Sequence, residues 1–457
     1  MKILLKGGTV VSAGGSAAAD VLLDGEKIAA VGPALPAGDA AVVDCTGKLL
    51  FPGFIDGHTH FDLPVAGTVT ADDFATGSRA ALRGGTTTVV DFATPNKGES
   101  LAFGLETWME KARNRAYCDY SFHMTIDDWS DGIRAELKDM MARGVTSFKM
   151  YMTYPAMMIG EGEMFAALKT LKALGGIAGV HCENHGVIGA LTAEAKAAGR
   201  LSPASHPRTR PAELEAEAVS HLLRMAQVTD CPVIVVHLST EEALKEVRAA
   251  RQRGQTVYVE TCPQYLLLED SVYDEEAYLQ AAKFVCAPPI RKPSDQQALW
   301  AAIRAGEVQT VATDHCSFTL EQKMAGRDDF TAIPGGLPGV EHRGVLLYSA
   351  GVARGRISES DMCRVLSENP ARLYGLWPQK GVIAPGSDAD IVVYDPEGDG
   401  VVTAEDHIQN TDYTPYEGMA LRGRISRVYL RGTLAVEDGA VLTGPEGKFI
   451  PRGQNSL

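Results

Sequence analysis

Residues 49–60 read Leu49-Leu50-Phe51-Pro52-Gly53-Phe54-Ile55-Asp56-Gly57-His58-Thr59-His60. The first seven residues are rich in large apolar side chains, a pattern that predicts a buried strand. Alternate residues of a strand face the same side, so His58 and His60 are expected to point together from the end of this strand. Imidazole is a ligand suited to zinc and related metals. The stretch alone leaves two interpretations open: half of a metal site, or two polar residues that end a strand.

The composition indicates the broad class of protein. The 457 residues are 45% hydrophobic and 22% charged, which is ordinary for a globular chain with a large core. The net charge of −15 argues against a nucleic-acid partner, and no stretch approaches the roughly 20 apolar residues of a membrane span. The apolar part of residues 1–8 is too short for a signal peptide, so we expect a cytoplasmic protein. The eight cysteines are scattered without a CxxC pair, which indicates neither a zinc ribbon nor a disulfide framework.

Two changes of pattern along the chain predict its domains. Residues 1–50 contain short strands separated by turns, and similar strands return in residues 381–457. Neither end has enough strands to close a core alone, so we expect the two ends to build one small β-sandwich. In residues 51–380, apolar runs alternate with helical stretches, which is typical of βαβ units and a parallel sheet.

Eight strand–helix units are expected in this central part, which predicts an α/β fold of the (β/α)8 TIM-like barrel type. The strand before His58 is the first, and the others are expected at residues 86–92, 120–124, 147–151, 178–181, 232–237, 256–261 and 310–313. Helices are expected at residues 71–82, 101–113, 133–141, 163–174, 212–226, 241–251 and 295–303. The catalytic chemistry of such a barrel lies at the C-terminal ends of its strands.

Polar residues stand at the ends of several of these strands. Lys149 lies in the fourth strand, His181 and His237 end the fifth and sixth, and Asp314 follows the eighth. A histidine that ends one apolar run is more often a hydrogen-bonded cap than a ligand. Because four strand ends besides that of His58 carry a potential ligand, the pattern favours a metal site.

Lys149 is unusual because it lies inside the apolar stretch Ser147-Phe148-Lys149-Met150-Tyr151. Burial beside a metal disfavours the ammonium, lowers its pKa and leaves a nucleophilic amine. Such an amine can react with carbon dioxide to give a carbamate, an anionic ligand whose two oxygens can bridge two cations. The alternative is a lysine paired with a nearby carboxylate, which would not explain its alignment with the other potential ligands.

With these motifs the chain resembles the amidohydrolase superfamily and, within it, the hydantoinase and dihydropyrimidinase family. The resemblance runs through nearly the whole chain. It is carried by residues 52–62, 146–154 and 381–390, and by Gly84-Gly85-Thr86-Thr87-Thr88, His181-Cys182-Glu183-Asn184 and Thr313-Asp314-His315-Cys316. Together these motifs are far more specific than a single H-x-H.

The resemblance implies a dinuclear enzyme that opens the cyclic amide of a hydantoin or dihydropyrimidine to an N-carbamoyl amino acid. The enzyme would bind two divalent ions, most often zinc, and a carbamate formed on Lys149 would bridge them. The ligands implied are His58, His60 and Asp314 for one ion, His181 and His237 for the second, and carboxylated Lys149 between them. The small-molecule substrate would be a cyclic ureide, and the resemblance suggests a homotetramer.

The resemblance also implies roles for residues around the metals. Asp314 would pass a proton to the leaving nitrogen, and Tyr154 would donate a hydrogen bond to the developing oxyanion. The backbone near Ala287 and Gly335 would bind the imide-like edge of the ring, although many relatives have serine and asparagine at these two positions. His185 and His315 are expected to orient neighbouring ligands without binding metal.

The ring substituent is expected to contact three loops, at residues 61–70, 93–99 and 152–159. Their apolar side chains suit an apolar or aromatic substituent; they are Leu63, Pro64, Val65, Met152, Met157, Met158 and Ile159. Asp62 disfavours a ring that carries a carboxylate, because relatives that open dihydroorotate have an arginine near this place. An allantoinase remains an alternative, as does a non-enzymatic scaffold related to dihydropyrimidinase.

Overall fold

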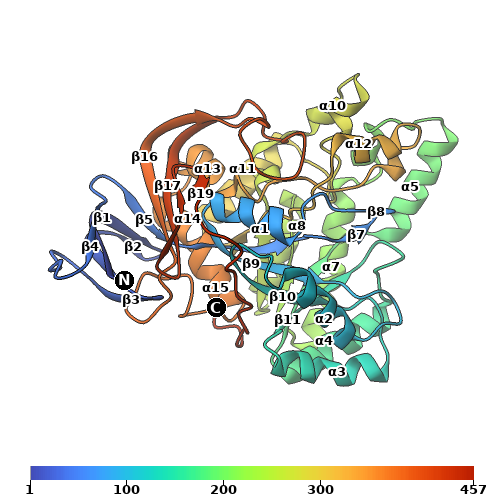
Figure 1. The fold of residues 1–457 in the computed structure, drawn as a ribbon. Helices are drawn as coiled ribbons and strands as arrows, with labels where there is room; N and C mark the ends of the chain where they lie inside the picture. The colour runs from blue at the N-terminus through green and yellow to red at the C-terminus, as the bar shows by residue number, and fades with distance from the viewer. Residues whose placement is uncertain (1) are drawn as a thin grey trace.

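The computed structural model describes residues 2–457, in which two large sheets dominate (Figure 1). One is an eight-stranded sheet whose strand order follows the sequence, with parallel pairing throughout. Its strands are β6 (Phe54–Thr59), β9 (Thr86–Ala93), β10 (Asp119–Thr125), β11 (Ser147–Tyr151), β12 (Ile177–His181), β13 (Val233–Val235), β14 (Val257–Thr261) and β15 (Thr310–Val311).

The two edges of this sheet meet at the end of β6. Thr59 forms a parallel bridge with His315, and the backbone N–H of His60 donates to the His315 carbonyl at 2.8 Å. The sheet therefore curls into a barrel, and the predicted (β/α)8 architecture is confirmed. β9 and β10 are buried along their whole length, because side chains fill the inside of the barrel and helices cover the outside.

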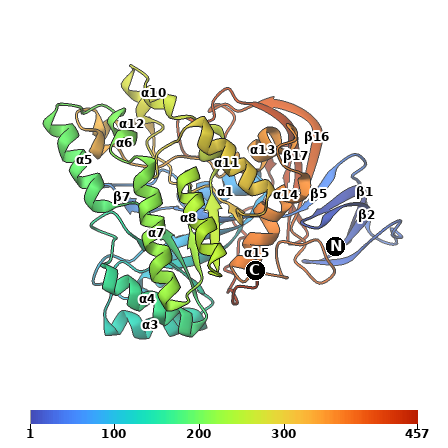
Figure 2. The same cartoon turned by 180° about the vertical axis from the view of Figure 1, so that it is seen from behind.

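Helices connect the barrel strands and surround the sheet (Figure 2). All seven predicted helices are present: α1 (Phe74–Arg83), α2 (Leu101–Ala112), α3 (Asp131–Ala142), α4 (Glu161–Leu174), α7 (Ala212–Thr229), α8 (Glu241–Gln252) and α11 (Pro293–Arg304). Shorter helices lie in the connections, among them α6 (Ser205–Arg208), α10 (Tyr278–Ala282), α12 (Leu320–Lys323) and α15 (Asn369–Leu373). Helix α5 (His185–Ala197) was not predicted, although its N-cap Asn184 accepts a hydrogen bond from the Val187 N–H, a recognisable start signal.

The two chain ends together build the second large sheet, which confirms that they share one β unit; that this unit is a sandwich stays a prediction. Its nine strands are β1 (Lys2–Ser12), β2 (Gly15–Asp24), β3 (Lys27–Gly32), β4 (Ala41–Asp44), β5 (Leu49–Pro52), β16 (Ile391–Val401), β17 (Ala420–Leu430), β18 (Thr433–Glu437) and β19 (Ala440–Val441). β5 joins the halves, since it pairs with β1 on one side and with β16 on the other. Where one domain ends and the next begins, near residues 50 and 380, stays a prediction.

The single strand predicted over residues 49–55 is wrong. β5 belongs to the sheet of the chain ends, whereas β6 belongs to the barrel, and the change occurs at Gly53. A Cβ atom at Gly53 would lie 2.1 Å from Oγ1 of Thr87 and 2.9 Å from Cβ of Asp390. The chain can pass between the two sheets here only because glycine has no side chain.

A buried cluster of charged side chains forms ion pairs between the barrel and the C-terminal part of the chain. Nζ of Lys380 lies 2.6 Å from Asp119 on β10, 2.7 Å from Asp390 and 3.0 Å from Asp388. Only 1% of the Lys380 side chain is exposed. One ammonium therefore connects a barrel strand with the residues that lead into β16.

No helix in residues 2–457 is both long enough and apolar enough to cross a bilayer.

Candidate metal centre

A cavity of about 460 Å³ opens at the C-terminal ends of the barrel strands. All nine site residues predicted from the sequence line it: His58, His60, Lys149, Tyr154, His181, His237, Ala287, Asp314 and Gly335. They come from different strand ends and from loops far apart in the sequence. The barrel therefore brings together the side chains that the sequence only suggested as a set.

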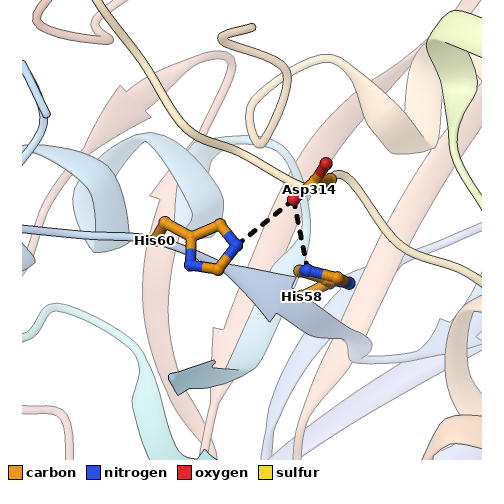
Figure 3. A group of neighbouring side chains, drawn as sticks. All are labelled: His58, His60 and Asp314. Carbon is orange, nitrogen blue, oxygen red and sulfur yellow. Dashed lines mark ion pairs between the residues drawn. The ribbon is translucent and has the colours of Figure 1, made fainter. Parts of the chain in front are cut away.

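His58, His60 and Asp314 form the tightest group in the cavity (Figure 3). Oδ1 of Asp314 lies 3.1 Å from Nε2 of His58 and 3.3 Å from Nε2 of His60. One ligand atom from each residue lies within 4.8 Å of the others, a spacing at which three donors can share one cation. Burial would raise the pKa of Asp314, but the two histidines outweigh this effect and lower it to about 2.

The other side of His58 contacts Glu260 on β14. Oε1 of this glutamate lies 2.5 Å from Nδ1 of His58 and also accepts the backbone N–H of His237 at 3.2 Å. A carboxylate on the second ring nitrogen orients a histidine ligand and leaves its other nitrogen free to bind. Burial raises the pKa of Glu260, whereas nearby Lys149 and the His237 N–H oppose this shift by favouring the carboxylate.

His181 and His237 form the second histidine pair, with ring centroids 4.6 Å apart. Nε2 of His181 lies 2.7 Å from Glu183, whose carboxylate also pairs with Arg210 at 2.6 Å. Burial lowers the pKa of both histidines below the ordinary value. Both rings therefore remain neutral at neutral pH, the form that binds metals.

Lys149 lines the same cavity as the two groups of histidines and is almost fully buried. Its Nζ is 5.0 Å from the ring centroids of Phe92 and Tyr151. Within residues 2–457 this nitrogen forms no ion pair or hydrogen bond, which contradicts the alternative of a lysine paired with a carboxylate. Burial lowers the pKa of Lys149 to about 8, although Asp314 and Glu260 oppose the shift.

Several histidine nitrogens at this site have no hydrogen-bond partner. Nε2 of His58 and Nδ1 of His60 and His237 are buried without one in the part of the chain described. A buried polar atom without a partner is costly, and a ligand or an ion commonly accounts for it. Three imidazoles and a carboxylate around a buried amine are a donor set that fits divalent metal ions.

The backbone at this site is held in an uncommon conformation. Tyr154, His237 and Asp314 have φ values of 70°, 38° and 52°, in the left-handed region that favours glycine. Such positions cost of order 1–3 kcal/mol each and concentrate at functional sites. At Asp314 the preceding residue is anchored, because the Thr313 hydroxyl donates to the buried Asp56 at 2.7 Å.

Tyr154 lies beside the second histidine pair, with its ring centroid 5.3 Å from that of His181. The Arg210 guanidinium lies 5.5 Å from the Tyr154 ring centroid. Burial raises the pKa of Tyr154, so its hydroxyl stays protonated and able to donate a hydrogen bond. This placement suits a donor to a carbonyl bound in the cavity.

The predicted substituent wall agrees with the structure in part. Leu63, Val65 and Met157 line the cavity as expected, whereas no residue of the loop at 93–99 does. The lining also includes residues that were not predicted, namely Thr192, Phe330 and Ile333. Most of the wall is apolar.

Three residues near the ligands do not line the cavity. Nε2 of His315 lies 3.0 Å from Asp72, and Nδ1 of His315 accepts the N–H groups of Gly339 and Val340. His185 contacts the Thr153 hydroxyl at 3.5 Å. The carbonyl of Asp62 accepts a hydrogen bond from Nζ of Lys111 at 2.6 Å, and Asp62 does not line the cavity; that the ring carries no carboxylate stays a prediction.

Sequence reasoning missed Glu260, Arg210 and Asp56. A glutamate inside the apolar strand of residues 256–261 is a signal that could have identified Glu260, since a buried carboxylate needs a partner. Asp56 lies in the first motif, but no local pattern indicates its hydrogen bond with Thr313. No local pattern marks Arg210, because its partners Glu183 and Tyr154 come from other strand ends.

Comparison with known proteins agrees with this geometry. Residues 49–435 match the amidohydrolase family. The chain is 42% identical to the D-hydantoinase of Geobacillus stearothermophilus over 99% of this chain and 97% of that protein. It is also 42% identical to the D-phenylhydantoinase of Escherichia coli O7:K1 (strain IAI39 / ExPEC), over 99% and 98% of the two chains.

The fold is equally similar to that of a solved relative. The crystal structure of dihydropyrimidinase from Brevibacillus agri NCHU1002 superposes with a TM-score of 0.98, covers 100% of both chains and is 42% identical. The resemblance that the motifs indicated is therefore confirmed over the whole length. By its sequence, its barrel and the residues around its cavity, the chain belongs to the amidohydrolase family.

Proposed function

We propose that this protein is a cyclic amidohydrolase that opens hydantoins or dihydropyrimidines to N-carbamoyl amino acids with the help of two bound divalent ions. One observation carries the proposal: the six potential metal ligands expected from the motifs converge on a single cavity, with His58, His60 and Asp314 already at metal-ligand spacing. The similarity to proteins named D-hydantoinase, D-phenylhydantoinase and dihydropyrimidinase supports the substrate class.

The residues divide between the two ions as follows. His58, His60 and Asp314 would hold one, His181 and His237 the other, and Lys149, carrying a carbamate, would lie between them. Carbamate formation joins the neutral Lys149 amine to the carbon of carbon dioxide and releases one proton. Divalent ions at this place would supply Lewis acidity for a carbonyl and a lowered pKa for water.

The protein's own groups would handle the protons and the developing charge. Asp314 would accept, on a carboxylate oxygen, the proton that the attacking water gives up, and return it to the ring nitrogen as the C–N bond breaks. Tyr154 would donate its hydroxyl hydrogen to the carbonyl oxygen as that oxygen becomes negative. The backbone at Ala287 and Gly335, which both line the cavity, would bind the imide-like edge of the ring.

The apolar wall of the cavity supports a ring with an apolar or aromatic substituent. Leu63, Val65, Met157, Phe330 and Ile333 offer mainly hydrocarbon and sulfur surface, against which a ureido group would lose hydrogen bonds to water. We therefore place 5-phenylhydantoin ahead of allantoin among the substrates.

Metal content and a small panel of rings test the function. We expect about two equivalents of zinc per chain after expression in zinc-supplemented medium, and hydrolysis of 5-phenylhydantoin and dihydrouracil in preference to allantoin. Preferred turnover of allantoin would make the protein an allantoinase. Absence of both bound metal and ring opening would support a non-enzymatic scaffold.

Three further properties belong to the same proposal. The ions are zinc, the protein acts in the cytoplasm, and four copies of the chain assemble into a homotetramer. Elemental analysis, cell fractionation and light scattering measure these properties separately from activity.

A further inference from the structure

Lys323, the last residue of α12, is a buried ammonium outside the group of metal ligands. It is 0% exposed, and within residues 2–457 no carboxylate pairs with it. Its Nζ instead donates to three backbone carbonyls: Pro334 at 2.7 Å, Val285 at 2.9 Å and Gly336 at 2.9 Å. Burial lowers the pKa of Lys323, which reflects the cost of placing this charge away from water.

The three carbonyls belong to two segments that wall the cavity. Val285 and Ala287 line it from one segment, and Gly335 and Gly336 line it from the other. The Gly336 N–H also donates to the Val285 carbonyl at 3.0 Å, so the segments touch directly. The ammonium is thus placed at the junction of these two stretches of backbone.

These contacts occupy particular backbone carbonyls of the two segments. Carbonyls on both sides of Gly335 point to Lys323, and the Cys286 carbonyl, just before Ala287, accepts His206 Nε2 at 2.7 Å. Gly336 has φ 153°, and a Cβ atom there would lie 2.3 Å from the Cys316 carbonyl. The backbone of both segments therefore has little freedom to turn.

The backbone of Lys323 is itself anchored. The Tyr278 hydroxyl of α10 donates to the Lys323 carbonyl at 2.7 Å, and the Lys323 N–H donates to Thr319 at 3.0 Å. A buried charge without a partner carboxylate contributes little to stability compared with an apolar side chain of similar size. Its three contacts at this junction are better explained by the backbone geometry that they impose.

We propose that Lys323 is a positioning residue that holds the backbone segments 285–287 and 334–336 in the orientation that binds the imide-like edge of the substrate ring. The inference deepens the proposed function and rests on it for the identity of the ring. Lys323 touches neither the metal ligands nor the reacting atoms. It acts through the backbone of Ala287 and Gly335.

Two substitutions of Lys323 test this role. Lys323→Met keeps most of the volume and removes all N–H donors, whereas Lys323→Gln keeps two donors on a shorter side chain. Lys196→Met is the control, because Lys196 is a half-exposed lysine that pairs with Asp329 at 2.6 Å and does not line the cavity.

We expect KM for 5-phenylhydantoin to rise roughly tenfold or more in Lys323→Met with a much smaller change in kcat, because contacts to the ring edge exist before and during reaction. Lys323→Gln should lie between this variant and the wild type, and Lys196→Met should match the wild type. Loss of kcat at constant KM in both Lys323 variants would indicate a general structural role and overturn the proposal.

Amide hydrogen exchange gives a readout that needs no activity. Exchange should accelerate in residues 284–287 and 335–337 of the Lys323 variants and stay unchanged in β6 and β12. Unchanged exchange in those two segments overturns the positioning role. If the wild-type protein opens no ring, the proposed function is wrong. The exchange rates of the two segments then still show whether Lys323 holds them.

Discussion

Oε1 of Glu260 contacts both halves of the metal site: it lies 2.5 Å from Nδ1 of His58 and 3.2 Å from the backbone nitrogen of His237. Glu260 is fully buried on β14 and is not among the residues that line the cavity. One carboxylate therefore sets the orientation of one ligand from each predicted metal position.

Glu260→Gln should weaken metal binding by about tenfold, because the neutral amide polarises the His58 ring less than a carboxylate does. Competition with a chelator measures the affinity, and kcat at saturating zinc should change less. Glu215→Gln is a matched control, since Glu215 is equally buried but contacts Ser239 and Arg291. Equal metal affinity in wild type and Glu260→Gln would contradict the orienting role.

Lys149→Ala should lose most activity and retain less than two equivalents of metal, since it removes the proposed bridging ligand. Wild-type protein equilibrated with 13C-labelled bicarbonate should show a carbamate resonance that the variant lacks. Lys111→Ala, which removes a half-buried lysine bound to the Asp62 carbonyl, should keep both metals. Full activity of Lys149→Ala with one metal per chain would rule out the dinuclear arrangement.

Tyr154→Phe should lower kcat by about 10²–10³, the usual cost of removing one donor to a developing oxyanion, with metal content unchanged. Tyr151→Phe is the comparison, because Tyr151 also lines the cavity and its ring centroid lies 6.3 Å from that of Tyr154. Steady-state kinetics of both variants on the same ring substrate measures the two effects on kcat. A similar loss in both variants would assign the effect to packing.

Gln322, next to Lys323 on α12, contacts a hairpin that forms a different part of the cavity wall. Its Nε2 donates to Thr68 and to the Val69 carbonyl, both at 2.8 Å, in the hairpin of β7 (Pro64–Val65) and β8 (Thr68–Val69). Gln322→Ala should raise KM for 5-phenylhydantoin by several-fold more than KM for unsubstituted hydantoin, because Val65 in this hairpin lines the cavity. Equal changes for both rings would exclude such a role.

Lys380→Met should destabilise the protein by about 3–5 kcal/mol at neutral pH, because it leaves buried carboxylates without their cation. The ammonium holds the pKa of Asp388 below its ordinary value, so this part of the wild-type stability is present above about pH 4 and is lost as the pH falls further. Denaturant unfolding measures the free energy of unfolding of wild type and variant at pH 7 and at pH 3.5. The difference between the two proteins should be smaller at pH 3.5. The same difference in free energy of unfolding at both pH values would mean that the charge of the carboxylates does not contribute to stability.

The barrel could be predicted because its signals are local. Apolar runs, helix caps and polar residues at strand ends follow from the side-chain periodicity of strands and helices. Seven of the eight expected barrel strands and all seven expected helices are present, and the first barrel strand begins at Phe54 instead of Leu49. The error at Gly53 has a physical cause: one apolar run suits a buried strand in either sheet, so composition cannot show where the chain changes sheets.

The sequence by itself determined the barrel, the shared sheet of the chain ends and the set of candidate ligands, because each depends on residue type and short spacing. Only the tertiary structure decided how these side chains are held. His58 and Glu260 are 202 residues apart, Asp56 and Thr313 are 257 apart, and Lys323 reaches two segments that no local pattern connects. Such contacts depend on how the closed barrel and its loops pack, and hydrogen-bond partners over these separations leave no periodic signal in the chain.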